Sequence, residues 1–138
     1  MSKMTREEIR EQTMQLIFQM DAVGDFDYQH LTLIPENEAL LKEKQAIATL
    51  EAIKKHLSAI DSCINQNTDK WKTDRIARTD LAILRLAVCE IYYIDSIPDR
   101  VSVNEAVRIA KKYGSERSYA FVNSVLGKIV RSRSRNNE

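Results

Sequence analysis

A stretch of fourteen residues, 81–94, constrains the fold more than any other part of the sequence. Every residue in it is apolar or aromatic except Arg85 and Glu90, so a helix formed there leaves no face for water. Such a helix has to be central, with other helices packed around it. The two charges would be partly buried and would need partners, which we interpret as a structural role in preference to a catalytic one.

The sequence on both sides of this stretch is typical of surrounding helices. Apolar residues recur at helical spacing behind a capping pattern, Thr5 with Glu8. They recur again from 37 to 65, where we expect one long helix or two consecutive ones. Between there and the central helix, Trp71 is expected to fold back onto the core. With 3 Gly and 2 Pro in 138 residues, the chain is predicted to be all-α.

Similar signals organise the C-terminal third. Pro98 ends the central helix, and a second capping pattern, Ser102 with Glu105, predicts the start of the next helix. Gly114 is expected to end that helix as a C-terminal cap, and a final helix is expected to start near Ser115. We predict a single domain over residues 1–131, followed by a basic, disordered tail at 132–138.

Several classes of function find no support in the sequence. It has no glycine-rich phosphate loop, no nucleophile elbow and no metalloenzyme spacing, so we predict neither an enzyme nor a cofactor. The only histidines are His30 and His56, and Cys63 and Cys89 lie far apart among apolar residues, which predicts free thiols and no metal site. Without an apolar run long enough for a membrane span or a signal peptide, the protein is expected to be cytoplasmic.

The charges are distributed unevenly along the chain. Residues 1–70 carry 8 Lys/Arg against 12 Asp/Glu, whereas residues 71–138 carry 13 against 8. The first half is therefore at −4 and the second at +5. This asymmetry is compatible with a polyanion-binding face, and equally with two solvated surfaces of opposite sign.

The segment "AKKYGSERSYAFVN", residues 110–123, places cations around aromatic rings at a break between two helices. Its cations are Lys111, Lys112 and Arg117, and its rings include Tyr113 and Phe121. Cations favour helix C-termini and aromatic residues fill cores, which explains most of the segment without a ligand. It does not explain Arg117, which is expected near a helix N-terminus. Cations for phosphates beside ring faces for unstacked bases are what recognition of single-stranded RNA requires.

Three motifs in order, "AILRLAVCEI", "VSVNEAVRIAKKYG" and "FVNSVLGKI", resemble the NusB family of transcription antitermination factors. The first helix, "REQTMQLIFQMD", is similar as well. Together with the helical spacing of the apolar residues, this resemblance implies about six to seven helices in two antiparallel bundles. It also implies that the protein has no enzymatic activity. It also implies that the protein pairs with a small-subunit ribosomal protein, NusE. The pair would bind the single-stranded boxA element of nascent RNA and help RNA polymerase read through terminators in ribosomal RNA operons.

The resemblance also implies functional residues. RNA contacts would fall on Arg6, Arg10 and Gln15 in the first helix and on Tyr113 and Phe121, and we add the neighbouring cations Lys111, Lys112 and Arg117. The partner surface would include Phe18 and Asp80. Phe18 could instead be an ordinary core residue, and Asp80 a helix N-terminal carboxylate. The sequence leaves open whether the protein forms a homodimer that covers the RNA surface.

In one respect the sequence departs from the family pattern. Where better-known members have a run of arginines, Glu7 and Glu8 lie between Arg6 and Arg10. Two carboxylates should weaken the electrostatic attraction to phosphate, and Arg117 could compensate. We therefore expect weak RNA binding by the protein alone. The alternative is a protein-interaction scaffold with little RNA affinity. An RNA-modification module is disfavoured because the chain has no room for a cofactor-binding α/β domain.

Overall fold

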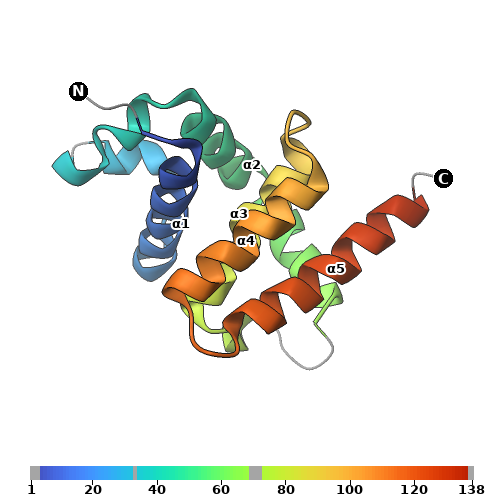
Figure 1. The fold of residues 1–138 in the computed structure, drawn as a ribbon. Coiled ribbons are helices and arrows are strands. Elements are labelled where there is room, and N and C mark those ends of the chain that lie inside the picture. The colour runs from blue at the N-terminus through green and yellow to red at the C-terminus, as the bar shows by residue number, and fades with distance from the viewer. Residues whose placement is uncertain (1–3, 33, 69–72, 137–138) are drawn as a thin grey trace.

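The computed structural model describes residues 4–32, 34–68 and 73–136, which contain five α-helices and no strand. The helices are α1 (Arg6–Val23), α2 (Lys44–Gln66), α3 (Arg78–Tyr93), α4 (Asp99–Tyr113) and α5 (Ser118–Asn136) (Figure 1). Among the same described residues, four short 3-10 helices occur at Tyr28–Leu31, Pro35–Asn37, Leu40–Lys42 and Thr73–Arg75. The predicted all-α class is confirmed. The predicted count of six to seven was too high, because the segments before α2 form only single 3-10 turns.

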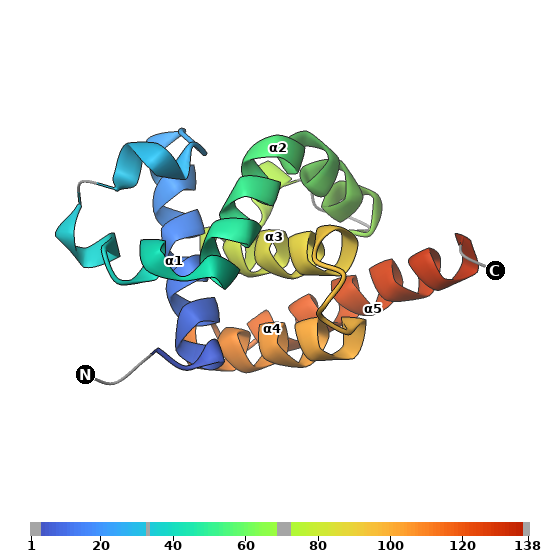
Figure 2. The same cartoon turned by 90° about the horizontal axis from the view of Figure 1, so that it is seen from above.

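Helix α3 is the centre of the fold. Every residue from 80 to 91 is buried, and α3 packs against each of the other four helices. In Figure 2 it lies between α2 on one side and α4 and α5 on the other, with α1 crossing near one end. The central position predicted from the apolar stretch 81–94 is therefore confirmed.

The two charges inside α3 have the partners that their burial requires. The Nε and Nη2 atoms of Arg85 each donate to a carboxylate oxygen of Asp61 at 2.9 Å. Its Nη1 atom lies 3.3 Å from Asp21, and its guanidinium lies over the Phe26 ring. Glu90 pairs with residues of α1 and α4, described below. Both charges join helices together, as expected for a structural role.

The helix starts confirm one capping prediction and overturn the other. Thr5 caps α1, and its Oγ1 accepts a hydrogen bond from the Glu8 backbone N–H at 3.0 Å. Ser102 does not cap α4, which begins at Asp99 directly after Pro98. Proline is compatible with a helix start and Asp99 supplies a favourable first-turn carboxylate. Ser102 is thus a buried residue inside the helix.

Helix α2 is kinked at His56. The helix begins at Lys44, later than the 37 expected, and His56 has non-helical dihedral angles of φ −119° and ψ 16°. The His56 ring stacks on Tyr93 of α3, with ring centroids 3.9 Å apart. The segment is therefore two consecutive helical pieces joined at a kink.

The turn between α4 and α5 depends on Gly114. This glycine ends α4 as predicted, but with φ −91° it is not left-handed. Its small size matters instead, because a Cβ there would collide with the side chain of Ser118 and with the carbonyl oxygen of Ala110. Helix α5, predicted to start near Ser115, starts at Ser118. Ser118 Oγ accepts the Ser115 backbone N–H at 2.8 Å and so ties the turn to the first residue of α5.

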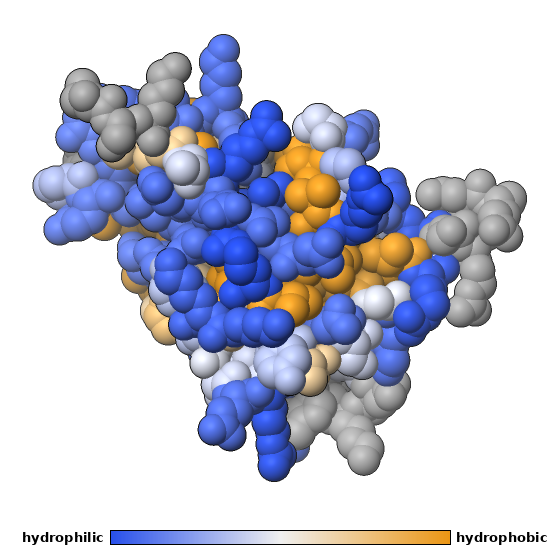
Figure 3. Space-filling model, viewed as in Figure 1, coloured by the Kyte–Doolittle hydropathy of each residue, from blue (hydrophilic) through white to orange (hydrophobic). Residues whose placement is uncertain are grey.

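The C-terminal segment differs from the prediction. Helix α5 runs to Asn136, so residues 132–136 are helical and are not the expected disordered tail. The prediction for Trp71 lies outside the described residues. None of the helices in the described part of the chain combines the length and apolar character needed to cross a membrane. The face seen in Figure 3 is mostly hydrophilic, with hydrophobic residues showing between hydrophilic ones where α4 and α5 pack.

Candidate nucleic-acid interface

Two surface grooves contain most of the predicted site residues. The first, which we call the α1–α4 groove, is lined by Met14, Gln15, Phe18, Gln19, Thr79 and Tyr113. Phe18 is 40% exposed and Tyr113 is 37% exposed, so both rings face solvent. The alternative that Phe18 is a core residue is therefore wrong. Gln15 and Tyr113, both predicted to contact RNA, share this groove with the predicted partner residue.

The second, which we call the α3–α5 groove, is formed by residues at the start of α3 and at the α4–α5 turn. Figure 1 shows that these two segments lie close together. It is lined by Arg75, Ile76, Ala77, Asp80, Ser115, Arg117, Ser118 and Phe121. Arg117 is exposed in the turn itself and Phe121 is half-buried. Asp80, the other predicted partner residue, is 7% exposed and lines this groove, not the one that contains Phe18. The two grooves are neighbours, because Thr79 lines one and Asp80 the other.

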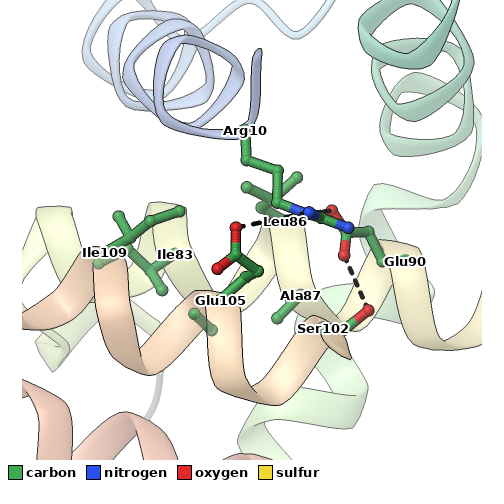
Figure 4. Close-up of a pocket in the computed structure, with 9 residues that line it drawn as sticks. Arg10, Ile83, Leu86, Ala87, Glu90, Ser102, Glu105 and Ile109 are labelled. Carbon is green, nitrogen blue, oxygen red and sulfur yellow. Dashed lines mark hydrogen bonds and ion pairs between the residues drawn. The ribbon is translucent and has the colours of Figure 1, made fainter. Parts of the chain in front are cut away.

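The two predicted RNA-binding cations of the first helix, Arg6 and Arg10, differ in their exposure to solvent. Arg6, Glu7 and Glu8 are exposed in the first turn of α1. Arg10 is 7% exposed, and its guanidinium points inward (Figure 4). Its Nε donates to Glu90 at 3.0 Å, and its Nη1 lies 3.5 Å from Glu105. Arg10 therefore cannot contact RNA without breaking buried ion pairs, and we remove it from the candidate RNA surface.

Glu90 receives a second buried hydrogen bond. The Ser102 hydroxyl donates to Glu90 Oε1 at 2.8 Å (Figure 4). This contact explains why Ser102 is not available as a helix cap. It also places Glu90 of α3 between α1 and α4, where it holds both helices.

Glu11 is the carboxylate that organises the end of α4. Its Oε1 accepts from Lys112 Nζ and from the Tyr113 hydroxyl, both at 2.7 Å, and its Oε2 accepts from Arg108 at 2.7 Å. Burial would raise the pKa of Glu11, but hydrogen bonds from Lys112, Arg108 and Tyr113 outweigh it and lower the pKa to about 2. The same hydrogen bond raises the pKa of Tyr113. Glu11 thus fixes the hydroxyl end of an exposed ring.

These ion pairs form one charge-balanced network. Arg108 also donates to Glu105, from Nε at 2.9 Å. The network then contains three cations and three carboxylates: Arg10, Arg108 and Lys112 with Glu11, Glu90 and Glu105. Lys112 was predicted to contact RNA. The structure shows that its charge is already compensated.

Three of the predicted cations keep their charge available. Within the described part of the chain, neither Arg6 nor Arg117 has an ion pair, and both are exposed. Lys111 is exposed and lies over the Tyr119 ring, 5.1 Å from its centroid. Of these three, Arg117 lines the α3–α5 groove, and Arg6 and Lys111 line neither groove.

Sequence reasoning missed Glu11 and Arg75. Glu11 is a single carboxylate on a helix rich in charge, and its only local signal is the helical spacing that puts it on the same side as the buried Met14. Arg75 comes before α3 in sequence, far from the 110–123 segment, and only the fold brings it beside Arg117.

Glu11→Gln is expected to destabilise the protein by about 2 kcal/mol, since hydrogen bonds to a charged group are lost. The stability that Glu11 contributes is fully present above its ordinary pKa of 4.5 and declines as pH falls toward its folded pKa of about 2. The variant should therefore show a shallower loss of stability across that range. Urea unfolding at several pH values measures both effects, and equal slopes in the two proteins would contradict the role assigned to Glu11.

Comparisons with known proteins agree with this fold. The family model described as "NusB family" matches residues 7–131. The transcription antitermination protein NusB of Alkaliphilus oremlandii is 45% identical over 130 residues, which cover 92% of this chain and 94% of that protein. The structure of T. maritima NusB has a TM-score of 0.81 at 32% identity, covering 94% of this chain and 93% of that one.

A further similar structure is a complex. It is a crystal structure of the antitermination factors NusB and NusE with dsRNA, in which the matched chain has a TM-score of 0.73 and is 23% identical. The match covers 92% of this chain and 96% of that chain. At that identity the likeness concerns the fold.

Proposed function

This chain belongs to the NusB family, and from that premise we propose that it is a transcription antitermination factor that binds single-stranded boxA-type RNA together with NusE. It would support read-through of ribosomal RNA operons and would have no enzymatic activity.

One observation carries the RNA-binding part of the proposal. Tyr113 and Phe121 line two neighbouring grooves at the α4–α5 turn, and Arg117 and Lys111 lie within the same segment without an ion pair in the described residues. Rings that bases can stack on, bordered by cations for phosphates, suit a single strand whose bases are unstacked. Gln15 lies beside Tyr113 and extends this surface onto α1.

The partner surface is proposed to include Phe18, on the α1 side of the α1–α4 groove. Phe18 exposes 40% of its surface there, beside the apolar side chain of Met14. Exposed aromatic side chains in a shallow groove are typical anchors for a protein partner.

The salt dependence of RNA binding tests the electrostatic part of this proposal. Arg6, Lys111 and Arg117 are the predicted contacts whose charges are not compensated. Three phosphate contacts on a single strand give a slope of about −2 in a plot of log K against log salt concentration. Binding measured between low and physiological salt provides the slope. A slope near zero would show that phosphates are not contacted.

The scaffold function is the second candidate, and the surroundings of Arg6 favour it. Arg10 is buried, and Glu7 and Glu8 are exposed next to Arg6. Replacing both glutamates with arginine adds cations without touching the core. If the protein is an antitermination factor that binds RNA, the affinity of this variant for RNA should rise only modestly. If the protein is a scaffold that had lost RNA binding, the variant should bind RNA where the parent protein does not. Parallel titrations of the variant and the parent protein distinguish the two functions.

A further inference from the structure

Asp80 has a buried oxygen atom without a hydrogen bond. The residue is 7% exposed and lines the α3–α5 groove, and no described residue donates to its Oδ1. An unpaired carboxylate oxygen in a buried position is costly. A ligand that brings an N–H donor into this groove would remove that cost.

The rest of the groove indicates what kind of ligand carries the donor. Arg75 and Arg117 approach from two different segments, one before α3 and one before α5, and both are exposed. Neither has an ion pair within the described residues. The half-buried ring of Phe121 lies in the same groove. Two cations, a ring face and a carboxylate acceptor match the phosphates, the plane and the edge of a nucleotide.

We propose that the α3–α5 groove holds one nucleotide of single-stranded RNA and selects guanine through Asp80. The base stacks on Phe121, the flanking phosphates contact Arg75 and Arg117, and an N–H of the base edge donates to Asp80. This inference rests on the proposed RNA-binding function, to which it adds base selectivity and a further contact, Arg75.

Guanine is selected because of the order of donors on its Watson–Crick edge. Its N1–H and N2 amino group lie side by side, so a carboxylate meets two donors. The N3–H of uracil lies between two carbonyl oxygens, which would repel the carboxylate. Cytosine and adenine present one amino group beside an acceptor nitrogen. Carboxylates accept from base donors, and each well-formed base contact discriminates substantially against the wrong base.

The test compares three labelled RNAs by fluorescence anisotropy, with and without NusE. They are an oligouridine, the same RNA with one central guanosine, and the same RNA with inosine there, which lacks only the N2 amino group. We expect the guanosine RNA to bind about tenfold tighter than the oligouridine, with inosine in between. Asp80→Asn should remove this preference. Its nearly identical shape keeps the fold, which thermal unfolding by circular dichroism verifies.

A matched pair of arginine variants tests the phosphate contact. Arg75→Gln should weaken binding of all three RNAs to a similar extent, since a phosphate contact does not read the base. Arg78→Gln removes an arginine near the same helix end that does not line the groove and whose Nη1 lies 3.4 Å from Asp21. It should leave RNA affinity unchanged.

The outcomes separate this inference from the proposed function. If the parent protein binds the oligouridine and the guanosine RNA equally tightly, guanine selection is wrong, while the proposed RNA binding still holds. This comparison requires the parent protein alone. Absence of binding to every RNA, with NusE present, overturns both. If the Asp80→Asn variant keeps the guanine preference but no longer binds NusE, the groove is a contact surface for the protein partner and the inference is wrong.

Discussion

Replacing Glu90 with alanine is expected to lower the free energy of unfolding by about 3–5 kcal/mol, because it leaves a buried charge without its partner. Arg10 is 7% exposed and would keep only its 3.5 Å contact with Glu105. The Ser102 hydroxyl would lose its acceptor as well. Urea unfolding followed by circular dichroism measures the change.

Two further variants make this prediction specific to the buried pair. Glu36→Ala removes an exposed glutamate from a 3-10 turn and should change stability by less than about 0.5 kcal/mol. The double variant Arg10→Met/Glu90→Leu should recover much of the loss, since a buried pair can often be replaced by apolar residues. A loss below about 1 kcal/mol in Glu90→Ala would mean that the pair is not buried in solution.

Tyr113→Ala/Phe121→Ala is expected to weaken RNA binding at least about 30-fold. Stacking of a base on an aromatic side chain contributes about 1–3 kcal/mol, and the variant removes two such rings. Both rings have other contacts: Tyr113 donates to Glu11 and Phe121 packs against the core. A stability measurement therefore accompanies the anisotropy titration.

Conservative variants separate stacking from folding. Tyr113→Phe keeps the ring and loses only the hydroxyl that donates to Glu11, so it should keep most of the RNA affinity. Phe121→Leu keeps apolar volume against the core and loses the ring face, so it should weaken RNA binding while the protein stays folded. If Phe121→Leu bound RNA as the parent does, Phe121 would be a core residue only.

The fold could be predicted where a local pattern sufficed. The apolar stretch 81–94 predicted a central helix because a helix without a polar face has to be covered on all sides. Thr5 was identified as a cap because its acceptor reaches a backbone N–H only three residues away. The predicted number of helices was wrong because the short apolar segments before residue 44 are compatible with a 3-10 turn as well as with a helix.

The charged residues could not be predicted, because their partners are distant in sequence. Arg10 looks like a surface cation on an amphipathic helix, and its burial depends on Glu90, 80 positions away. Lys112 looks free at a helix C-terminus, yet it pairs with Glu11, 101 positions away. Ser102 matches a local capping pattern that a buried carboxylate of another helix overrides. Residue type and spacing identified the segment, while only the fold shows which charges remain available.

Fluorescence anisotropy of a labelled boxA-type single-stranded RNA should be measured with this protein alone, with NusE alone and with both together. We expect weak binding to this protein alone and much tighter binding to the mixture, because Arg10 and Lys112 are engaged in internal ion pairs and few cations remain for phosphate. The Tyr113→Ala/Phe121→Ala variant should lose the enhancement while it still folds. Failure of the mixture to bind RNA any better than NusE alone would contradict an RNA-binding role for this chain.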